Sequence, residues 1–207
     1  MPTYELDITF DTAGLDALNA SGQSVTIVKQ STGGQATAWI NFKPQLANSV
    51  TWTEQYSVYS STTNAQAGAV ILTSSEATAI GGSSYNLNSS GYFDPGVSGA
   101  VGPTQYEIQN SDPGLMIGTT AMVTAGLVQG ASVNGTTVSS PMCAAGVLFN
   151  QTATFTPIET IMVYTSSYSN NGIVISQVAG NALTVTYTTN TTASITYNDQ
   201  NNQFINS

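Results

Sequence analysis

The sequence predicts an all-β protein, an antiparallel β-sandwich of the jelly-roll or immunoglobulin-like type. Short runs of alternating apolar and polar residues recur along the chain, as in strands that bury one face. Val, Ile, Thr and aromatic residues, which fit a pleated surface, are concentrated in these runs. Gly, Asn, Ser and Pro separate the runs at the short intervals that are typical of sandwiches and barrels.

The predicted elements follow from this alternation in chain order. Before residue 81, strands are expected over residues 4–10, 24–30, 37–42, 49–60 and 68–74. After residue 103 they are expected over residues 104–110, 120–129, 145–150, 152–157, 160–166, 172–177, 182–188 and 193–198. Helical spacing occurs near residues 12–20, where Leu15 and Leu18 are three positions apart and either Asp11 or Thr12 can cap the first turn.

Residues 81–103 form a connector that is rich in Gly, Ser and Pro and is longer than most loops inside a compact domain. The segments on its two sides resemble each other. We therefore expect a single sandwich domain over residues 1–207, with the hypothesis that half-repeats 1–80 and 104–207 are duplicated β layers. The matched positions are Phe42 with Phe149, Trp52 with Phe155, Val58 and Tyr59 with Val163 and Tyr164, and Val70 and Ile71 with Val174 and Ile175.

The charge of the chain excludes several classes of partner. Only 6% of the 207 residues are charged, against about 25% in a typical globular protein. The net charge is −9, and the cations are two lysines, Lys29 and Lys43. Because phosphate and anionic lipid are bound by clusters of cations, we expect neither nucleic acid nor an acidic membrane surface as a partner.

The residue types present also argue against catalysis. The chain has no His, so a Ser-His-Asp or Cys-His arrangement and a His-based zinc site are excluded. Cys143 is expected to be a buried small apolar side chain. Glycoside hydrolysis by two carboxylates remains open in principle at Glu54, Glu107 and Glu159, although exposed strand positions explain them more economically. We therefore expect no enzyme and no organic cofactor.

Calcium is the metal that this composition allows, because its ligands are carboxylate, amide and carbonyl oxygens. Three segments are candidates, those around Asp94, Asp112 and Asp199. None has the spacing of a known calcium loop, and turn formation explains these sequences, which include two Asp-Pro-Gly triplets, more economically.

A lectin-like protein that binds neutral glycans without catalysis is the leading functional interpretation. Sugar sites combine hydrogen-bonding amides and hydroxyls with an aromatic face for the apolar side of the ring, and Tyr can supply that face. The polar-aromatic loops therefore give six candidate ligand-binding residues, which are Asn64, Tyr92, Asp94, Tyr168, Asn170 and Asn171.

Two alternatives come from the uncharged C-terminal half, where Glu159 is the only charged residue between residues 113 and 198. Strand edges without Lys are poorly protected against pairing with other chains, which favours a homo-oligomer or fibre built from copies of this protein. Alternating uncharged strands also suit a β-pore-forming toxin, with membrane contact only after oligomerisation.

The first ten residues have neither the basic nor the apolar region of a signal peptide. No apolar run approaches the roughly 20 residues of a membrane helix. The composition resembles that of extracellular proteins. We therefore expect a signal already removed, a cytosolic protein, or release by a non-classical route.

Overall fold

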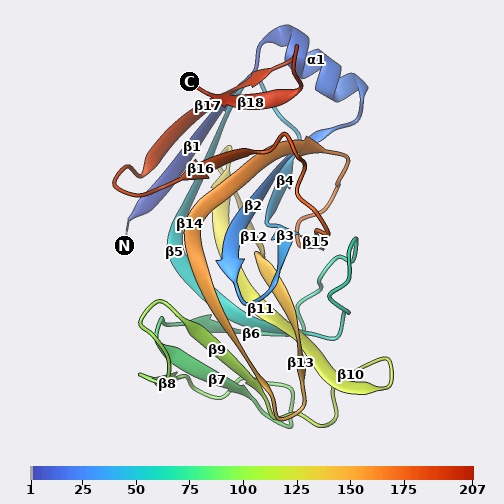
Figure 1. Ribbon diagram of the computed structural model, residues 1–207, viewed down its shortest axis with the longest axis vertical. Helices are drawn as coiled ribbons and strands as arrows, with labels where there is room; N and C mark the ends of the chain where they lie inside the picture. The colour runs from blue at the N-terminus through green and yellow to red at the C-terminus, as the bar shows by residue number, and fades with distance from the viewer. Residues whose placement is uncertain (1) are drawn as a thin grey trace.

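The computed structural model describes residues 2–207 and shows a protein that is nearly all β. Two sheets pack against each other, and most of the apolar core lies between them (Figure 1). The helix α1 (Thr12–Ala20) stands at the end of the sandwich where the C-terminal strands also lie. The predicted all-β sandwich and the predicted short helix are both confirmed.

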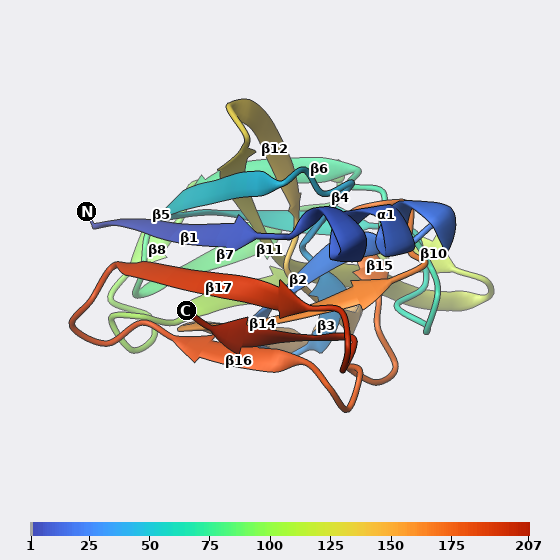
Figure 2. The ribbon, with the colours of Figure 1, turned by 90° about the horizontal axis from the view of Figure 1, so that it is seen from above.

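The larger sheet contains eleven strands. Figure 2, seen from above, shows the hairpin that ends in β12 standing out from the body of the molecule. Three strands lie beside the main path of the sheet, namely β10 (Met116–Ile117) and β12 (Thr136–Pro141), which pair with β11, and β6 (Ser75–Ala79), which pairs with β5. The main path runs in the order β15 (Ile173–Val174), β3 (Gln35–Ala38), β13 (Cys143–Leu148), β11 (Thr120–Val133), β5 (Ala47–Ser61), β1 (Thr3–Thr9), β17 (Thr192–Asn198) and β18 (Gln203–Asn206).

The smaller sheet contains seven strands. One of them, β16 (Leu183–Thr186), lies off the main path and pairs with β14. The path itself runs in the order β4 (Ile40–Phe42), β2 (Ser24–Thr32), β14 (Thr152–Ser166), β9 (Tyr106–Asn110), β7 (Ser83–Leu87) and β8 (Val97–Ser98).

The sheets are mixed, which differs in detail from the predicted antiparallel sandwich. Two pairs are parallel, β1 with β17 and β7 with β9, and the remaining named pairs are antiparallel. Parallel neighbours need a long crossover connection. For β1 and β17 that connection is most of the chain, so alternation within each strand could not reveal the direction of pairing.

Some predicted strand boundaries were wrong. Residues 152–157 and 160–166 belong to one strand, β14, because an irregularity in the pairing accommodates Pro157. Residues 68–74 form no strand and contribute one isolated bridge between Val70 and Ile173. The connector 81–103 contains β7 and β8, whose serine-rich sequences resemble loops.

The helix α1 begins directly after Asp11, one of the two predicted capping residues. The Asp11 side chain accepts a hydrogen bond of 2.7 Å from the Gly14 backbone N–H, which satisfies a donor of the first turn. Leu18 packs into the core, and the chain leaves the helix through Gly22 at a φ of 68°, in the left-handed region that suits glycine.

The two longest strands, β5 and β14, share an unusual feature. Residues 53–55 of β5 lie opposite one residue of β11, Gly130, between the paired positions Trp52–Ala131 and Tyr56–Gln129. Residues 158–160 of β14 likewise lie opposite one residue of β2, Gln30. Such bulges bend a strand and redirect its side chains. Glu54 is the middle residue of one bulge and Glu159 is the middle residue of the other.

The surroundings of β5 and β14 also correspond. Each has 15 residues, and each pairs on one side with a single strand that continues across the bulge, β11 or β2. On the other side, β1 and β6 share β5, while β9 and β16 share β14. An internal duplication would produce this correspondence, and the duplication itself stays a prediction.

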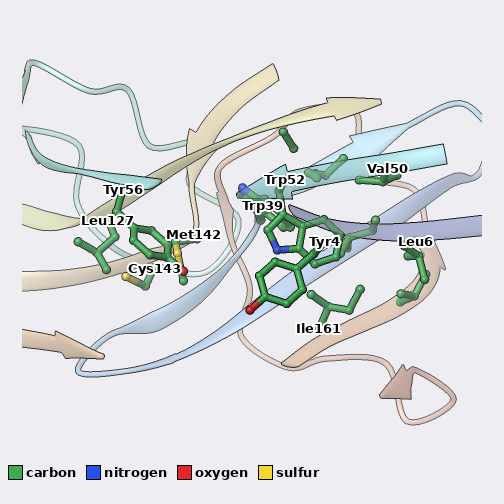
Figure 3. Close-up of a cluster of buried hydrophobic side chains, with 14 of the residues drawn as sticks. Tyr4, Leu6, Trp39, Val50, Trp52, Tyr56, Leu127, Met142, Cys143 and Ile161 are labelled. Carbon is green, nitrogen blue, oxygen red and sulfur yellow. The ribbon is translucent and has the colours of Figure 1, made fainter. Parts of the chain in front are cut away.

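Large side chains fill the core between the sheets. Trp39 and Phe155 are completely buried, as is the single cysteine, Cys143, beside Met142 and Leu127 (Figure 3). Burial raises the pKa of the Cys143 thiol to about 11. The expected buried, small apolar side chain is therefore confirmed at this position.

Close packing makes one glycine of β11 essential. A Cβ at Gly126 would lie 2.1 Å from the Cys143 carbonyl oxygen, whereas one at Gly130, on the same strand, would meet nothing closer than 3.8 Å. We expect Gly126→Ala to lower the free energy of unfolding by about 3 kcal/mol through overpacking. Gly130→Ala is the matched control and should change it by less than about 1 kcal/mol. Urea unfolding measures both, and equal effects would contradict the packing argument.

Candidate functional site

The six predicted sugar-binding residues do not form one cluster. Tyr92 and Asp94 lie in the loop between β7 and β8, and Tyr92 is 67% exposed. Asn170 and Asn171 line a cleft of about 360 Å³, together with Glu76. The other two lie in the flanking loops: Asn64 is in the segment after β5, and Tyr168 packs partly into a small apolar cluster.

Hydrogen bonds within the protein already occupy some of these side chains. The two Asp94 oxygens each accept a bond of 2.7 Å, from the amides of Asn86 and Asn88, and these bonds lower the pKa of Asp94. The Asn171 side-chain oxygen accepts a bond of 2.6 Å from the Asn41 backbone N–H. The Asp94 carboxylate therefore stabilises the loop in which it lies. In the cleft, the Asn170 side chain is more available to a ligand than that of Asn171, whose oxygen is already bonded.

The calcium candidates lie in three different places in the fold. Asp112 accepts a bond from the Gly114 backbone N–H at 2.7 Å, as expected of an Asp-Pro-Gly turn, and Asp199 lies in the turn between β17 and β18. Within residues 2–207 there is no group of three or more His, Cys, Asp or Glu side chains placed to hold a metal ion. A calcium site at Asp94, Asp112 or Asp199 stays a prediction.

The three glutamates that sequence analysis considered for acid–base chemistry are divided by the fold. Glu54 and Glu159 line one pocket between the two sheets, which we call the acidic pocket. Glu107 lies on β9 between the buried residues Tyr106 and Ile108, so its side chain points to the opposite face of the sheet. The bulges of β5 and β14 therefore bring together two carboxylates that are 105 positions apart in the sequence.

Glu159 is held by donors on every side. Lys29 Nζ lies 2.8 Å from both carboxylate oxygens, and its side chain is fully buried. The Tyr56 hydroxyl donates to Oε1 at 2.9 Å, and the Trp52 indole N–H donates to Oε2 at 3.3 Å. Because Lys29 and Glu159 belong to the small sheet while Trp52 and Tyr56 belong to β5, this network ties the two sheets together.

An aromatic cage surrounds the Lys29 ammonium. Its nitrogen lies 5.6 Å from the ring centroids of Trp39 and Trp52 and 5.5 Å from that of Tyr56, within the range of cation–π attraction. Tyr4 stacks on Trp52 with ring centroids 5.7 Å apart, and Figure 3 shows these two side chains close to Trp39. Burial lowers the pKa of Lys29, and the Glu159 carboxylate opposes that shift. The cage and the carboxylate together make a buried cation tolerable.

Glu54 is far less constrained than Glu159. Its Oε1 accepts a short hydrogen bond from the Tyr4 hydroxyl, and burial together with this bond raises the pKa of Tyr4. No group among residues 2–207 hydrogen-bonds Oε2. Glu54 is half-buried and lines the pocket, so it offers a free carboxylate oxygen to a ligand.

The rest of the acidic pocket combines aromatic and polar groups. Its volume is about 320 Å³, and Gly81, Pro103, Thr104, Tyr106 and Pro157 line it with the residues already described. Tyr106 is only 7% exposed and packs edge-on against the Tyr56 ring at 5.4 Å. Its hydroxyl has no hydrogen-bond partner in the described part of the chain and is accessible to solvent. A hydroxyl and a carboxylate oxygen that make no hydrogen bond within residues 2–207 therefore both belong to residues that line the pocket.

The contacts of Glu159 argue against hydrolysis by the carboxylate pair. A glycosidase needs one carboxylate to donate or accept a proton and the other to attack the sugar or activate water. Four donor contacts occupy the oxygens of Glu159, about as many as a carboxylate can accept. Glu159 is therefore suited to hold the pocket together, and Glu54 to contact a ligand.

Glu54 and Glu159 were candidates from the sequence, whereas the residues that surround them in the pocket were not. Tyr4, Lys29, Tyr56 and Tyr106 occupy ordinary alternating positions in strands, and alternation predicts burial without saying what a side chain faces. Pro157, two residues before Glu159, was a local signal for an irregularity in that strand. No comparable residue marks the bulge at Glu54.

The losses in the free energy of unfolding caused by replacing Lys29 and Glu159 should not be additive. We expect Lys29→Met to lower the free energy of unfolding by about 3 kcal/mol, because it leaves the Glu159 charge in a largely buried site without its cation. The double variant Lys29→Met/Glu159→Gln should lose less than the sum of the two single variants, by at least about 1 kcal/mol. Chemical unfolding of the four proteins closes this cycle, and additive losses would show that the two side chains act independently.

The chain matches no protein-family model, no curated protein and no solved structure. The helix among residues 2–207 is too short and too polar to cross a membrane. Since a sandwich fold is compatible with many activities, the chemistry of the acidic pocket is the guide to function.

Proposed function

We propose that this protein binds saccharides without transforming them, and that the acidic pocket is its sugar site. Tyr106 carries the proposal, because this residue lines the pocket and its accessible hydroxyl has no hydrogen-bond partner among residues 2–207. A sugar hydroxyl bound there would satisfy it, and the free oxygen of Glu54 would accept a second sugar hydroxyl. Lectin-like pockets join such groups to aromatic side chains, here Tyr56 and Tyr106.

Removing the hydroxyl of Tyr106 tests this assignment. We expect Tyr106→Phe to weaken saccharide binding about tenfold, because it removes one hydrogen bond to the ligand and none within the protein. The ligand would first be identified on a glycan array that displays neutral, amino and acidic saccharides, and its affinity would then be measured by titration calorimetry. Thermal unfolding should be nearly unchanged.

Tyr92→Phe is the matched control, since it makes the same chemical change in an exposed loop. Asn170→Ala reports on the cleft that contains two of the predicted residues. Loss of binding in Asn170→Ala alone would place the sugar in that cleft and contradict the acidic pocket. An array on which no saccharide binds, with or without calcium, would contradict the function itself.

Self-assembly is the second candidate, and one feature of the fold favours it. Within residues 2–207, β12 pairs with β11 alone, so its other edge is open, and the strand carries no charge. Ile80 and Ser139 line a shallow pocket near this edge, and the Ile80 side chain is 68% exposed. An uncharged open edge is a template for pairing with another chain.

Light scattering across a concentration range tests assembly through this edge. We expect a mass above that of the monomer and a return to monomer in Thr137→Lys, because a lysine on an edge strand opposes pairing. Thr192→Lys, on the internal strand β17, is the control. A monomer at every concentration would contradict assembly. No comparable observation favours a β-pore-forming toxin, which stays a prediction.

A further inference from the structure

The acidic pocket has a local charge that the overall composition hides. It contains the carboxylates of Glu54 and Glu159 and borders one ammonium, that of Lys29. Lys43, the other cation among the side chains, is bound to the backbone carbonyls of Gly22 and Gln23 near α1. Lys29 forms its ion pair with Glu159 and acts on Glu54 only at longer range, so no cation among residues 2–207 is in direct contact with Glu54.

We infer that, among saccharides, the acidic pocket selects amino sugars, whose free ammonium group pairs with Glu54. This inference rests on the proposed saccharide-binding function and names the class of ligand. Glu54 Oε2 is the acceptor, since Oε1 is already bonded to Tyr4 and both oxygens of Glu159 are filled. A hydrogen bond between an ammonium and a carboxylate is about twice as strong as one between neutral groups.

The walls of the pocket strengthen this preference. Tyr56 and Tyr106 line it and are almost fully buried, so an ion pair formed there is screened less than one on the surface. Their electron-rich faces attract cations as well. The protein uses the same chemistry internally, because the Lys29 ammonium already sits at 5.5 Å from the Tyr56 ring and within 2.8 Å of a carboxylate.

The same arrangement disfavours the other classes of sugar. A uronic acid, a sialic acid or a sulfated sugar would meet the Glu54 carboxylate, and the chain has no Arg or His to bind the anion. A neutral sugar can form hydrogen bonds with Glu54 and Tyr106 through its hydroxyl groups. These bonds are weaker than the bond between an ammonium group and the Glu54 carboxylate. The expectation of neutral glycans rested on the amides, hydroxyls and aromatic rings of the loops, whereas the acidic pocket adds a carboxylate to such groups.

Three disaccharides with one linkage and different charge test the inference by calorimetry. They are β-1,4-linked glucosamine, its N-acetylated form and β-1,4-linked glucose. We expect the glucosamine disaccharide to bind about tenfold more tightly than the other two. Glu54→Gln should reduce the affinity ratio between the glucosamine disaccharide and the neutral disaccharides to about one, and Glu107→Gln, on the opposite face of the sheet, should leave that ratio intact.

The possible outcomes separate this inference from the function on which it rests. Equal affinity for the three disaccharides, or a preference that survives Glu54→Gln, would overturn the selectivity and leave saccharide binding in place. A fourth probe, putrescine, carries ammonium groups without a sugar. Tight binding of putrescine with no binding of any saccharide would overturn the saccharide function and identify the pocket as a cation site. No binding of any of the four probes would overturn both.

Discussion

The interaction on which the rest of the structure depends is the buried ion pair between Lys29 and Glu159. Charges are costly to remove from water, and this protein removes a lysine completely. The structure compensates with the rings of Trp39, Trp52 and Tyr56, and the last two, on β5, also donate hydrogen bonds to Glu159 of the other sheet. The hydrogen bonds of Glu159 with Lys29, Trp52 and Tyr56 therefore fix the positions of β14, β2 and β5 relative to one another.

The bulges explain how regular strands can meet this requirement. A strand with strict alternation points every second side chain into the core and cannot adjust one residue alone. Two extra residues in β14 let Glu159 turn toward Lys29, and the matching irregularity in β5 turns Glu54 toward the same pocket. The two carboxylates then take different roles because their neighbours differ. Four donor contacts saturate Glu159, whereas Tyr4 is the one described partner of Glu54.

The low charge of the surface underlies the proposed selectivity of the acidic pocket. A protein with many surface cations would surround any carboxylate with competing partners. Here the cations are two lysines, one locked in the core and the other bound near α1, so Glu54 keeps its charge available. The same scarcity leaves strand edges such as that of β12 without the lysines that normally discourage pairing. One feature of composition thus bears on both candidate functions.

The sequence by itself determined the all-β class, the position and cap of α1, and the burial of Cys143, because these depend on periodicity and on contacts a few residues apart. It also named Glu54, Glu107 and Glu159 as strand carboxylates, although exposed positions were the favoured explanation for all three. Only the tertiary structure decided that Glu54 and Glu159 share a pocket while Glu107 faces away, that β1 pairs with β17, and that Tyr106 lacks a partner. Those facts depend on which strands become neighbours and on where two bulges interrupt the pairing. Packing across the whole chain determines which strands pair and where the bulges lie, and the local alternation of residues does not encode either.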